Sequence, residues 1–150
     1  MHRPAPAFPV PSAALVVLQL AALAALALPW GRAWHDWGWP LLAAAALVGA
    51  WTLRHNRLGN FGVMPEPKPH AQLITSGPYC YVRHPIYLAV LLFGAGMLVG
   101  WRGWQHLFAF AVLCVVLHFK ADREEALMSA RFPGYAAYRA RTKRLIPFVL

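Results

Sequence analysis

The chain has 150 residues, of which 59% are hydrophobic and 13% are charged, and its formal net charge is +9. The chain has too few polar residues to cover the surface of a soluble domain, which excludes an ordinary soluble protein. The basic residues flank apolar runs and no nucleic-acid motif interrupts them, so the charge does not indicate a nucleic-acid partner. The two cysteines, Cys80 and Cys114, do not form a disulfide framework.

Four apolar runs follow one another at residues 12–28, 41–53, 86–101 and 104–119. A membrane-spanning helix needs roughly 17 to 25 such residues. The first run has that length, the second reaches it if residues 37–40 are counted, and the last two are slightly short and form a tight hairpin through "WRGW". The first run also resembles a cleavable signal peptide, but its Pro-rich opening favours a retained helix.

We therefore expect an all-α integral membrane protein with about four transmembrane helices and a C-terminal cytoplasmic or interfacial helix. The whole chain, 1–150, is expected to form a single domain. Its parts are two N-terminal helices (1–53), a cytoplasmic loop (54–84), a helical hairpin (85–119) and a cytoplasmic tail (120–150).

The positive charges predict the orientation. With the N-terminus inside, the outer loops contain Arg32 and Arg102 alone, out of 14 Lys and Arg residues. The remaining twelve lie on the inner side: Arg3, Arg54, Arg57, Lys68, Arg83, Lys120, Arg123, Arg131, Arg139, Arg141, Lys143 and Arg144. This bias predicts a multi-pass protein of the bacterial inner membrane, with the loop 54–84 and the C-terminus in the cytoplasm. The lipid bilayer is then its partner, and no obligate protein partner is inferred.

The first polar cluster on the inner side lies in "TSGPYCYVRHPIYLAV", residues 75–90. Pro85 suits the first turn of the third helix, where its missing N–H is no loss. His84 and Tyr87 are three residues apart and Arg83 and Tyr87 are four apart, so these side chains can share one face if the helix starts early. The start of a helix also attracts a carboxylate. A membrane anchor with an aromatic belt would explain Arg83 and one tyrosine, but not a histidine between Arg and Pro.

The second cluster is "DREE", residues 122–125, expected at the end of the fourth helix. Acidic side chains there oppose the helix dipole, so Glu124 and Glu125 need a cation or a hydrogen-bond donor. One interpretation is a solvated turn with a local Lys120–Glu124 pair. The other is a carboxylate that accepts hydrogen bonds from a ribose diol or pairs with Arg83.

The tail beyond this cluster is interrupted at "FPG", residues 132–134, and ends in a basic, amphipathic piece. We expect this piece to lie along the inner surface of the membrane, with Tyr135, Tyr138, Leu145 and Ile146 toward lipid.

Three segments carry a resemblance to a known family: "LITSGPYCYVRHPIY" at 73–87, "EE" at 124–125 and "FPGYAAYRARTKRLIP" at 132–147. Together they resemble the isoprenylcysteine carboxyl methyltransferase and phospholipid methyltransferase superfamily of integral membrane methyltransferases. The resemblance covers roughly the C-terminal two-thirds of the chain. It implies that the protein is an enzyme that binds S-adenosyl-L-methionine on the cytoplasmic side, without a metal.

By position in these motifs, the resemblance implies a set of cofactor-binding residues: Gln72, Leu73, Ile74, Tyr79, His84, Pro85, Ile86, Tyr87, Glu124 and Glu125. Which of the two glutamates contacts the cofactor is left open. The implied catalytic residues are Arg83, His84 and Glu124, and Lys120 and Arg123 are implied to bind the acceptor. Lys120 stands where the carboxyl methyltransferases have an arginine, and lysine is not a bidentate partner for a carboxylate.

Methyl transfer from a sulfonium is an in-line displacement, so alignment and exclusion of water can do much of the catalysis. The expected acceptor is lipophilic and carries a prenylcysteine-type carboxylate, a phospholipid amine or a thiol. A carboxylate needs a cation such as Lys120 or Arg123, whereas an amine needs a base such as His84 or a glutamate. We expect it to enter between the third and fourth helices. The alternative is a non-catalytic membrane scaffold or a haem-binding four-helix protein, since His106 and His118 lie in the fourth run.

Overall fold

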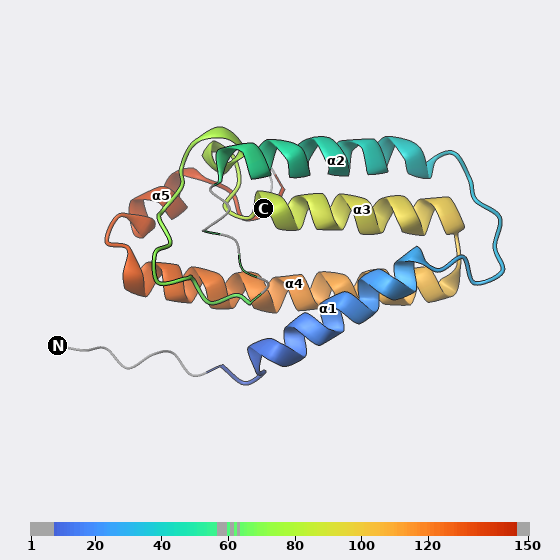
Figure 1. Ribbon diagram of the computed structural model, residues 1–150, viewed down its shortest axis with the longest axis horizontal. Coiled ribbons are helices and arrows are strands. Elements are labelled where there is room, and N and C mark those ends of the chain that lie inside the picture. Colours follow the sequence, from blue (N-terminus) through green and yellow to red (C-terminus); the bar gives the residue numbers. More distant parts are fainter. Residues whose placement is uncertain (1–7, 57–59, 61, 63, 147–150) are drawn as a thin grey trace.

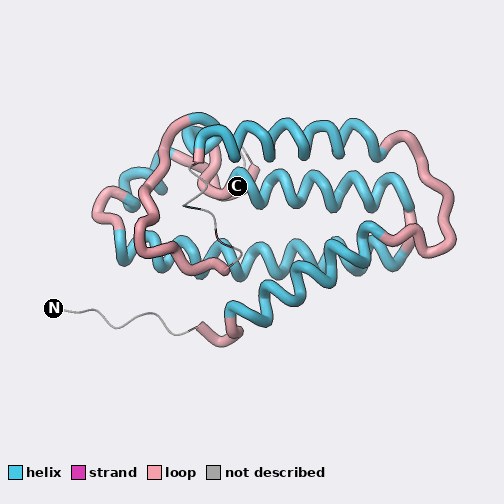
Figure 2. The backbone as a smooth tube through the Cα atoms, in the orientation of Figure 1, coloured by secondary structure: helices cyan, strands magenta, loops and turns pink. Residues whose placement is uncertain are grey.

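The computed structural model describes residues 8–56, 60, 62 and 64–146. Its helices are α1 (Ser12–Ala27), α2 (Gly38–His55), the 3₁₀ turn η2 (Gly77–Cys80), α3 (Pro85–Trp101), α4 (Trp104–Arg131) and α5 (Tyr135–Arg141) (Figure 1). No β-strand occurs in this part of the chain, apart from a single bridge between Val82 and Lys143. Figure 2 shows the same distribution of helix and loop. The prediction of an all-α protein is confirmed for the described residues. Arg3, Arg57 and Pro147, used in the sequence predictions, lie outside them.

The four long helices correspond to the four apolar runs of the sequence. Among the described helices, α4 alone is both long and apolar enough to cross a membrane by length and composition. α1 and α3 are apolar but shorter, with 16 and 17 residues. Four membrane spans therefore remain a prediction.

The acidic cluster lies inside α4 rather than at its end. The helix continues past Glu125 to Arg131, and its last turn contains a basic residue. The prediction that Glu124 and Glu125 oppose the helix dipole is therefore wrong, because a carboxylate more than a turn from the terminus feels little of it. What compensates these two carboxylates is a set of neighbouring side chains, described below.

The helices pack in pairs, α2 on α3 and α1 on α4, with α3 also in contact with α4 (Figure 1). Glycines allow the close approach of α3 to its neighbours. A Cβ atom at Gly94 would lie 3.0 Å from the side chains of Leu113 and Phe110 on α4. A Cβ atom at Gly96 would lie 2.9 Å from Leu42 on α2. The α3–α4 interface is thus filled near Gly94, where the sequence suggested a path for the acceptor.

The polar residues gather at one end of the bundle. There α4 extends beyond the start of α3, α5 folds back over it, and the loop after α2 runs alongside (Figure 1). Two arginines of α4 tie this loop down. Arg131 Nη1 donates to the carbonyl of Lys68 at 2.7 Å, and Arg123 Nε pairs with Glu66 at 3.0 Å. The loop therefore forms one wall of a cavity at this end.

Candidate active site

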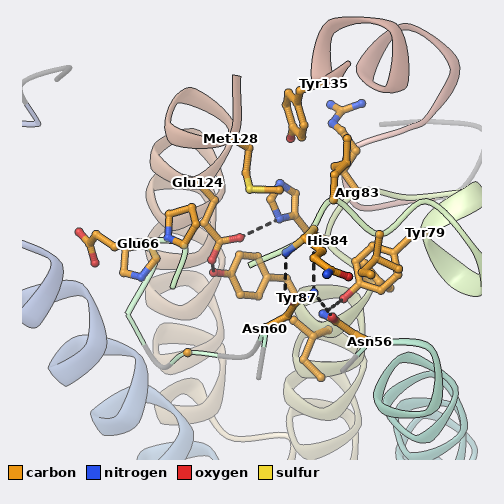
Figure 3. A pocket seen from close by; sticks show the side chains of 18 of the residues that line it. Asn56, Asn60, Glu66, Tyr79, Arg83, His84, Tyr87, Glu124, Met128 and Tyr135 are labelled. Atoms are coloured by element: carbon orange, nitrogen blue, oxygen red, sulfur yellow. Dashed lines mark hydrogen bonds and ion pairs between the residues drawn. The ribbon is translucent and has the colours of Figure 1, made fainter. Parts of the chain in front are cut away.

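The cavity lies where α2 ends, α3 begins and the polar half of α4 passes beneath α5 (Figure 3). Its lining combines all the predicted cofactor-binding residues except Glu125, and Arg83 of the predicted catalytic residues, with several that were not predicted. The predicted members are Gln72, Leu73, Ile74, Tyr79, Arg83, His84, Pro85, Ile86, Tyr87 and Glu124. The structure thus brings together residues from 72–74 and from α4 that are about fifty positions apart in sequence.

His84 occupies the position just before α3 and is 6% exposed. Its backbone N–H donates to the carbonyl of Arg144 at 3.1 Å, which fixes the residue against the tail. The imidazole lies between two carboxylates, with Nδ1 3.2 Å from Glu124 Oε2 and Nε2 3.2 Å from Glu125 Oε1. Burial by itself lowers the pKa of His84, but the hydrogen bonds to Glu124 and Glu125 outweigh burial and raise it. His84 is therefore held as a cation that donates from both ring nitrogens.

Tyr87 aligns the carboxylate of Glu124. Its ring stacks on the His84 imidazole with centroids 5.3 Å apart and an interplanar angle of 7°. Its hydroxyl donates to Glu124 Oε1, while His84 donates to the other oxygen of the same carboxylate. The two rings lie face to face although His84 precedes the helix, which begins at Pro85, so their contact does not come from helical spacing. Glu124 is thus held by two donors at the cavity wall, with 27% of its side chain exposed.

Glu125 has a different environment from Glu124. Arg83 Nε donates to Glu125 Oε1 at 2.9 Å, and Arg139 and Arg144 each approach within 3.5 Å. Burial raises the pKa of Glu125, but the bonds from His84 and Arg83 outweigh this and lower it to about 2. Glu125 is outside the cavity lining among the described residues. A glutamate of this pair was expected either to pair with Arg83 or to accept hydrogen bonds from a ligand. Glu125 forms the pair with Arg83, and Glu124 remains available to a ligand.

Arg83 lines the cavity, but its guanidinium is turned toward the tail (Figure 3). Besides Glu125, it donates through Nη1 to the carbonyls of Arg139 and Thr142, at 3.2 and 2.5 Å. The side chain is 9% exposed. The protein's own groups therefore occupy two of the three nitrogens of the Arg83 guanidinium, Nε and Nη1.

Backbone pairing with the tail holds residues 81–84 in place. Lys143 N donates to the carbonyl of Tyr81 at 3.0 Å, and Arg83 N donates to the carbonyl of Lys143 at 2.8 Å. These bonds form the bridge between Val82 and Lys143. Residues 81–84, the tail and the start of α3 meet here, so the orientation of His84 depends on the tail as well as on α3.

The tail corrects one prediction. Tyr135 and Tyr138 were expected to face lipid, but they are 2% and 3% exposed and line the cavity. Tyr138 also donates from its hydroxyl to the carbonyl of Tyr79 at 2.8 Å. The amphipathic pattern of the tail was correct in form, but its apolar face packs on the protein. Ile146 is exposed, as expected of a residue facing lipid.

The residues predicted to bind the acceptor, Lys120 and Arg123, are not part of the cavity lining described above. Lys120 is buried, donates to Gln19 Oε1 of α1 at 2.7 Å and lies 5.6 Å from the centroid of the Tyr87 ring. Arg123 pairs with Glu66 and donates to the carbonyl of Val10 at 2.9 Å. Both side chains connect α4 to other segments of the chain, and their role toward an acceptor stays a prediction.

Several lining residues were not predicted from the sequence, notably Asn56, Asn60 and Met128. Asn56 donates to the Tyr79 hydroxyl at 2.8 Å, and Asn60 donates to Asn56 at 2.9 Å. Asn60 also accepts from the backbone N–H of Gln72 at 3.1 Å, which fixes the 72–74 segment. The signal was available: two asparagines four residues apart, directly after an apolar run. Burial raises the pKa of Tyr79 to about 12, partly offset by the bond from Asn56, so its hydroxyl stays neutral.

In the part of the chain that the structure describes, the side chains of His84, Tyr87 and Glu124 converge on one cavity. Such a convergence of ionisable groups on a cavity is a feature of enzyme sites. The model of one protein family, described as Phospholipid methyltransferase, matches residues 34–134. This match covers more than half of the chain, and the chain therefore belongs to this methyltransferase family. It includes α2, α3, α4 and every cavity-lining residue except Tyr135 and Tyr138. A search of curated proteins gave no match.

Proposed function

We propose that this protein transfers a methyl group from S-adenosyl-L-methionine to a lipophilic acceptor, in the cavity between α3, α4 and α5. The observation that carries the proposal is the different placement of the two adjacent glutamates. Glu125 is enclosed by Arg83, His84 and two further arginines, whereas Glu124 faces the cavity and is aligned by Tyr87 and His84. A carboxylate fixed in this way suits a ligand that presents hydroxyl groups.

The chemistry of the lining fits the proposed cofactor. Glu124 can accept hydrogen bonds from a ribose diol, and the partial positive charge at the start of α3 can attract a carboxylate. Tyr79 and Tyr135, which also line the cavity, offer aromatic rings suited to a positively charged group. When bound, S-adenosyl-L-methionine supplies a methyl group activated by its positively charged sulfur. The residues of the chain hold, orient and shield the reacting groups, which is the main requirement of a displacement reaction.

The proposed reaction needs few proton transfers. The acceptor atom forms a bond to the methyl carbon while the carbon–sulfur bond breaks. The electron pair of the broken bond stays on sulfur. A carboxylate or thiolate acceptor needs no base at this step, whereas an amine must lose a proton. Because His84 is held protonated by two glutamates, it is a poor base, and Glu124 is the better candidate in the amine case.

We place the cavity at the cytoplasmic face of a membrane that all four long helices cross. In this arrangement residues 104–119 of α4 lie in the bilayer, and the rest of α4 projects into the cytoplasm with α5. α1 and α3 are close to the minimum length of about 17 residues for a span. The described Lys and Arg residues support this orientation, since Arg32 and Arg102 alone lie in the two connections at the opposite end. A multi-pass location in the bacterial inner membrane follows from the proposal.

Calorimetric titration of the detergent-purified protein with S-adenosyl-L-methionine tests the proposal. We expect saturable binding that falls at least about tenfold in Glu124→Gln, because a charge-assisted hydrogen bond contributes roughly 1.5–3 kcal/mol. Asp36→Asn is the matched control, since it removes one negative charge from an exposed site at the other end of the bundle. Absence of binding in folded wild-type protein, or equal affinity in Glu124→Gln, would contradict the proposal.

A further inference from the structure

Two asparagines, Asn56 and Asn60, connect the end of α2 to two other segments of the cavity wall (Figure 3). Asn56 directly follows α2, and its backbone N–H donates to the carbonyl of Thr52 at 2.9 Å, which closes the last turn of the helix. Both asparagine side chains line the cavity and are half-buried. Their hydrogen bonds form a chain that runs from the backbone of Gln72 to the hydroxyl of Tyr79.

The backbone of Gln72 determines which way the amide of Asn60 faces. A peptide N–H can donate a hydrogen bond but not accept one, and a peptide carbonyl can accept but not donate. The N–H of Gln72 donates to Asn60 Oδ1 at 3.1 Å, and Asn60 Nδ2 donates to the carbonyl of Gln72 at 3.2 Å. A reversed amide would place donor against donor and acceptor against acceptor. The positions of the oxygen and the nitrogen of Asn60 are therefore fixed by two separate partners.

The orientation of Asn60 determines that of Asn56 in turn. Asn60 Nδ2 also donates to Asn56 Oδ1 at 2.9 Å, so the Asn56 atom that faces it has to be the acceptor of the amide. Asn56 Nδ2 is then the atom that lies 2.8 Å from the Tyr79 hydroxyl oxygen. Tyr79 therefore accepts this hydrogen bond and does not donate it.

The remaining consequence concerns the proton of the Tyr79 hydroxyl. A phenol has one proton to donate, and the bond from Asn56 does not use it. The hydroxyl stays neutral, since its pKa is raised to about 12. The carbonyl of Tyr79 accepts from the hydroxyl of Tyr138 at 2.8 Å, so the residue is held at its backbone as well as at its hydroxyl. Tyr79 lines the cavity, and its proton is available to an acceptor atom of a ligand.

We propose that Asn56 and Asn60 are positioning residues that fix Tyr79 as a hydrogen-bond donor toward the cofactor and hold the adjacent wall at Gln72. This inference rests on the proposed function and adds a specificity determinant to it. The cofactor atom that contacts the Tyr79 hydroxyl is an acceptor, such as a ring nitrogen or an oxygen. The two asparagines act through Tyr79 and Gln72, and their effect is on binding of the cofactor.

The test reverses the direction of the hydrogen bonds with Asn56→Asp. An ionised aspartate has nearly the shape of asparagine but can only accept, so it takes the Tyr79 proton away from the ligand. Binding of the reaction product S-adenosyl-L-homocysteine, which lacks the sulfonium charge, is measured by calorimetry on the detergent-purified protein. We expect the affinity to fall about tenfold, as when one hydrogen bond is lost. Asn56→Ala leaves the Tyr79 proton free to reach the ligand, and we expect a smaller loss of about threefold.

A charge control and a double variant show whether Asn56 acts through Tyr79. Ser76→Asp adds the same charge at an exposed position three residues before Tyr79, outside the cavity lining, and we expect unchanged affinity. Tyr79→Phe removes the hydroxyl and should lower the affinity about tenfold. In that background Asn56→Asp should have no further effect, because the two residues act as one unit.

The order of the effects distinguishes positioning from a structural role. An asparagine that only supports the fold would lose more on Asn56→Ala, which removes both hydrogen bonds, than on Asn56→Asp. That order, or additive losses in the double variant, would overturn the inference and leave the proposed function standing. Absence of binding by folded wild-type protein would overturn both proposals.

Chemical unfolding in detergent shows which variants are folded. Asn60→Asp replaces Asn56→Asp where the latter does not fold. Its carboxylate still accepts from the Gln72 N–H but no longer donates to Asn56, so the Asn56 amide turns over and its oxygen takes the Tyr79 proton. We expect the same loss of about tenfold, again absent in the Tyr79→Phe background. Unchanged affinity in folded Asn60→Asp would contradict the inference.

Discussion

The two ends of the bundle each contain a buried histidine, and the two histidines have different surroundings. His106, near the α3–α4 turn, has no measurable exposure, lies 2.8 Å through Nε2 from the carbonyl of Leu28 and stacks on Trp101. His84 is almost as buried but contacts two carboxylates at the wall of a cavity. Burial is therefore not what distinguishes a functional histidine. The difference lies in the ionisable partners and in access to a ligand.

The strongest test of this contrast removes a charge from the cluster around His84. Glu125→Gln leaves the buried Arg83 beside a neutral neighbour. We expect the free energy of unfolding to fall by about 3–5 kcal/mol, the usual effect of removing one partner of a buried ion pair. The measurement is chemical unfolding in detergent. Asp122→Asn is the control on the same helix, since its contacts with Arg144 and His118 are exposed and removing its charge costs less than about 1 kcal/mol. Equal losses in the two variants would mean that the cluster does not stabilise the fold.

Replacing each of the two histidines in turn by glutamine compares the two ends of the bundle directly. His84→Gln removes a cation beside Glu124, and we expect the rate of methyl transfer to fall roughly 100-fold, as when one positioned donor is lost. His106→Gln should keep the rate and the cofactor affinity and lose about 1 kcal/mol of stability with its hydrogen bond to Leu28. Steady-state kinetics and unfolding of both variants decide the point. A comparable drop in rate for His106→Gln would remove the distinction between the ends.

The smallest expected effect is the pH dependence of stability. The folded pKa of His84 is raised, so its contribution is complete below the unfolded value of about 6.5 and is lost as the pH rises through the folded value. Glu125, with its pKa lowered to about 2, contributes constantly at neutral pH. Thermal unfolding between pH 6 and pH 9 should therefore show a decline in wild type that is weaker in His84→Gln. The same slope in both proteins would show that His84 is not the titrating group.

Much of the fold could be predicted because apolar runs are a local property. The run at 12–28 became α1 (Ser12–Ala27), and Pro85 begins α3 as its position before an apolar run indicated. The motif of residues 73–87 and the two glutamates identified the family, which the match over 34–134 confirms.

The sequence could not distinguish the roles of Glu124 and Glu125. Consecutive residues on a helix point about 100° apart, because a turn contains 3.6 residues, and the direction each one faces depends on the neighbouring segments. Here Glu124 faces Tyr87 and the cavity, while Glu125 faces Arg83 and the tail. The position of the tail could not be predicted from the sequence either, because the pairing of Lys143 with residues 81–83 is a long-range contact that leaves no local sequence pattern.

The most direct test of the central claim is transfer of a labelled methyl group into lipid. Purified protein is placed in vesicles of bacterial polar lipids, supplied with methyl-labelled S-adenosyl-L-methionine, and the organic extract is counted and separated. We expect label in an extractable amphiphile with wild type and Asp36→Asn, and a loss of at least about tenfold with Glu124→Gln. Folded protein that binds the cofactor but leaves the organic extract unlabelled would contradict transfer to a membrane lipid.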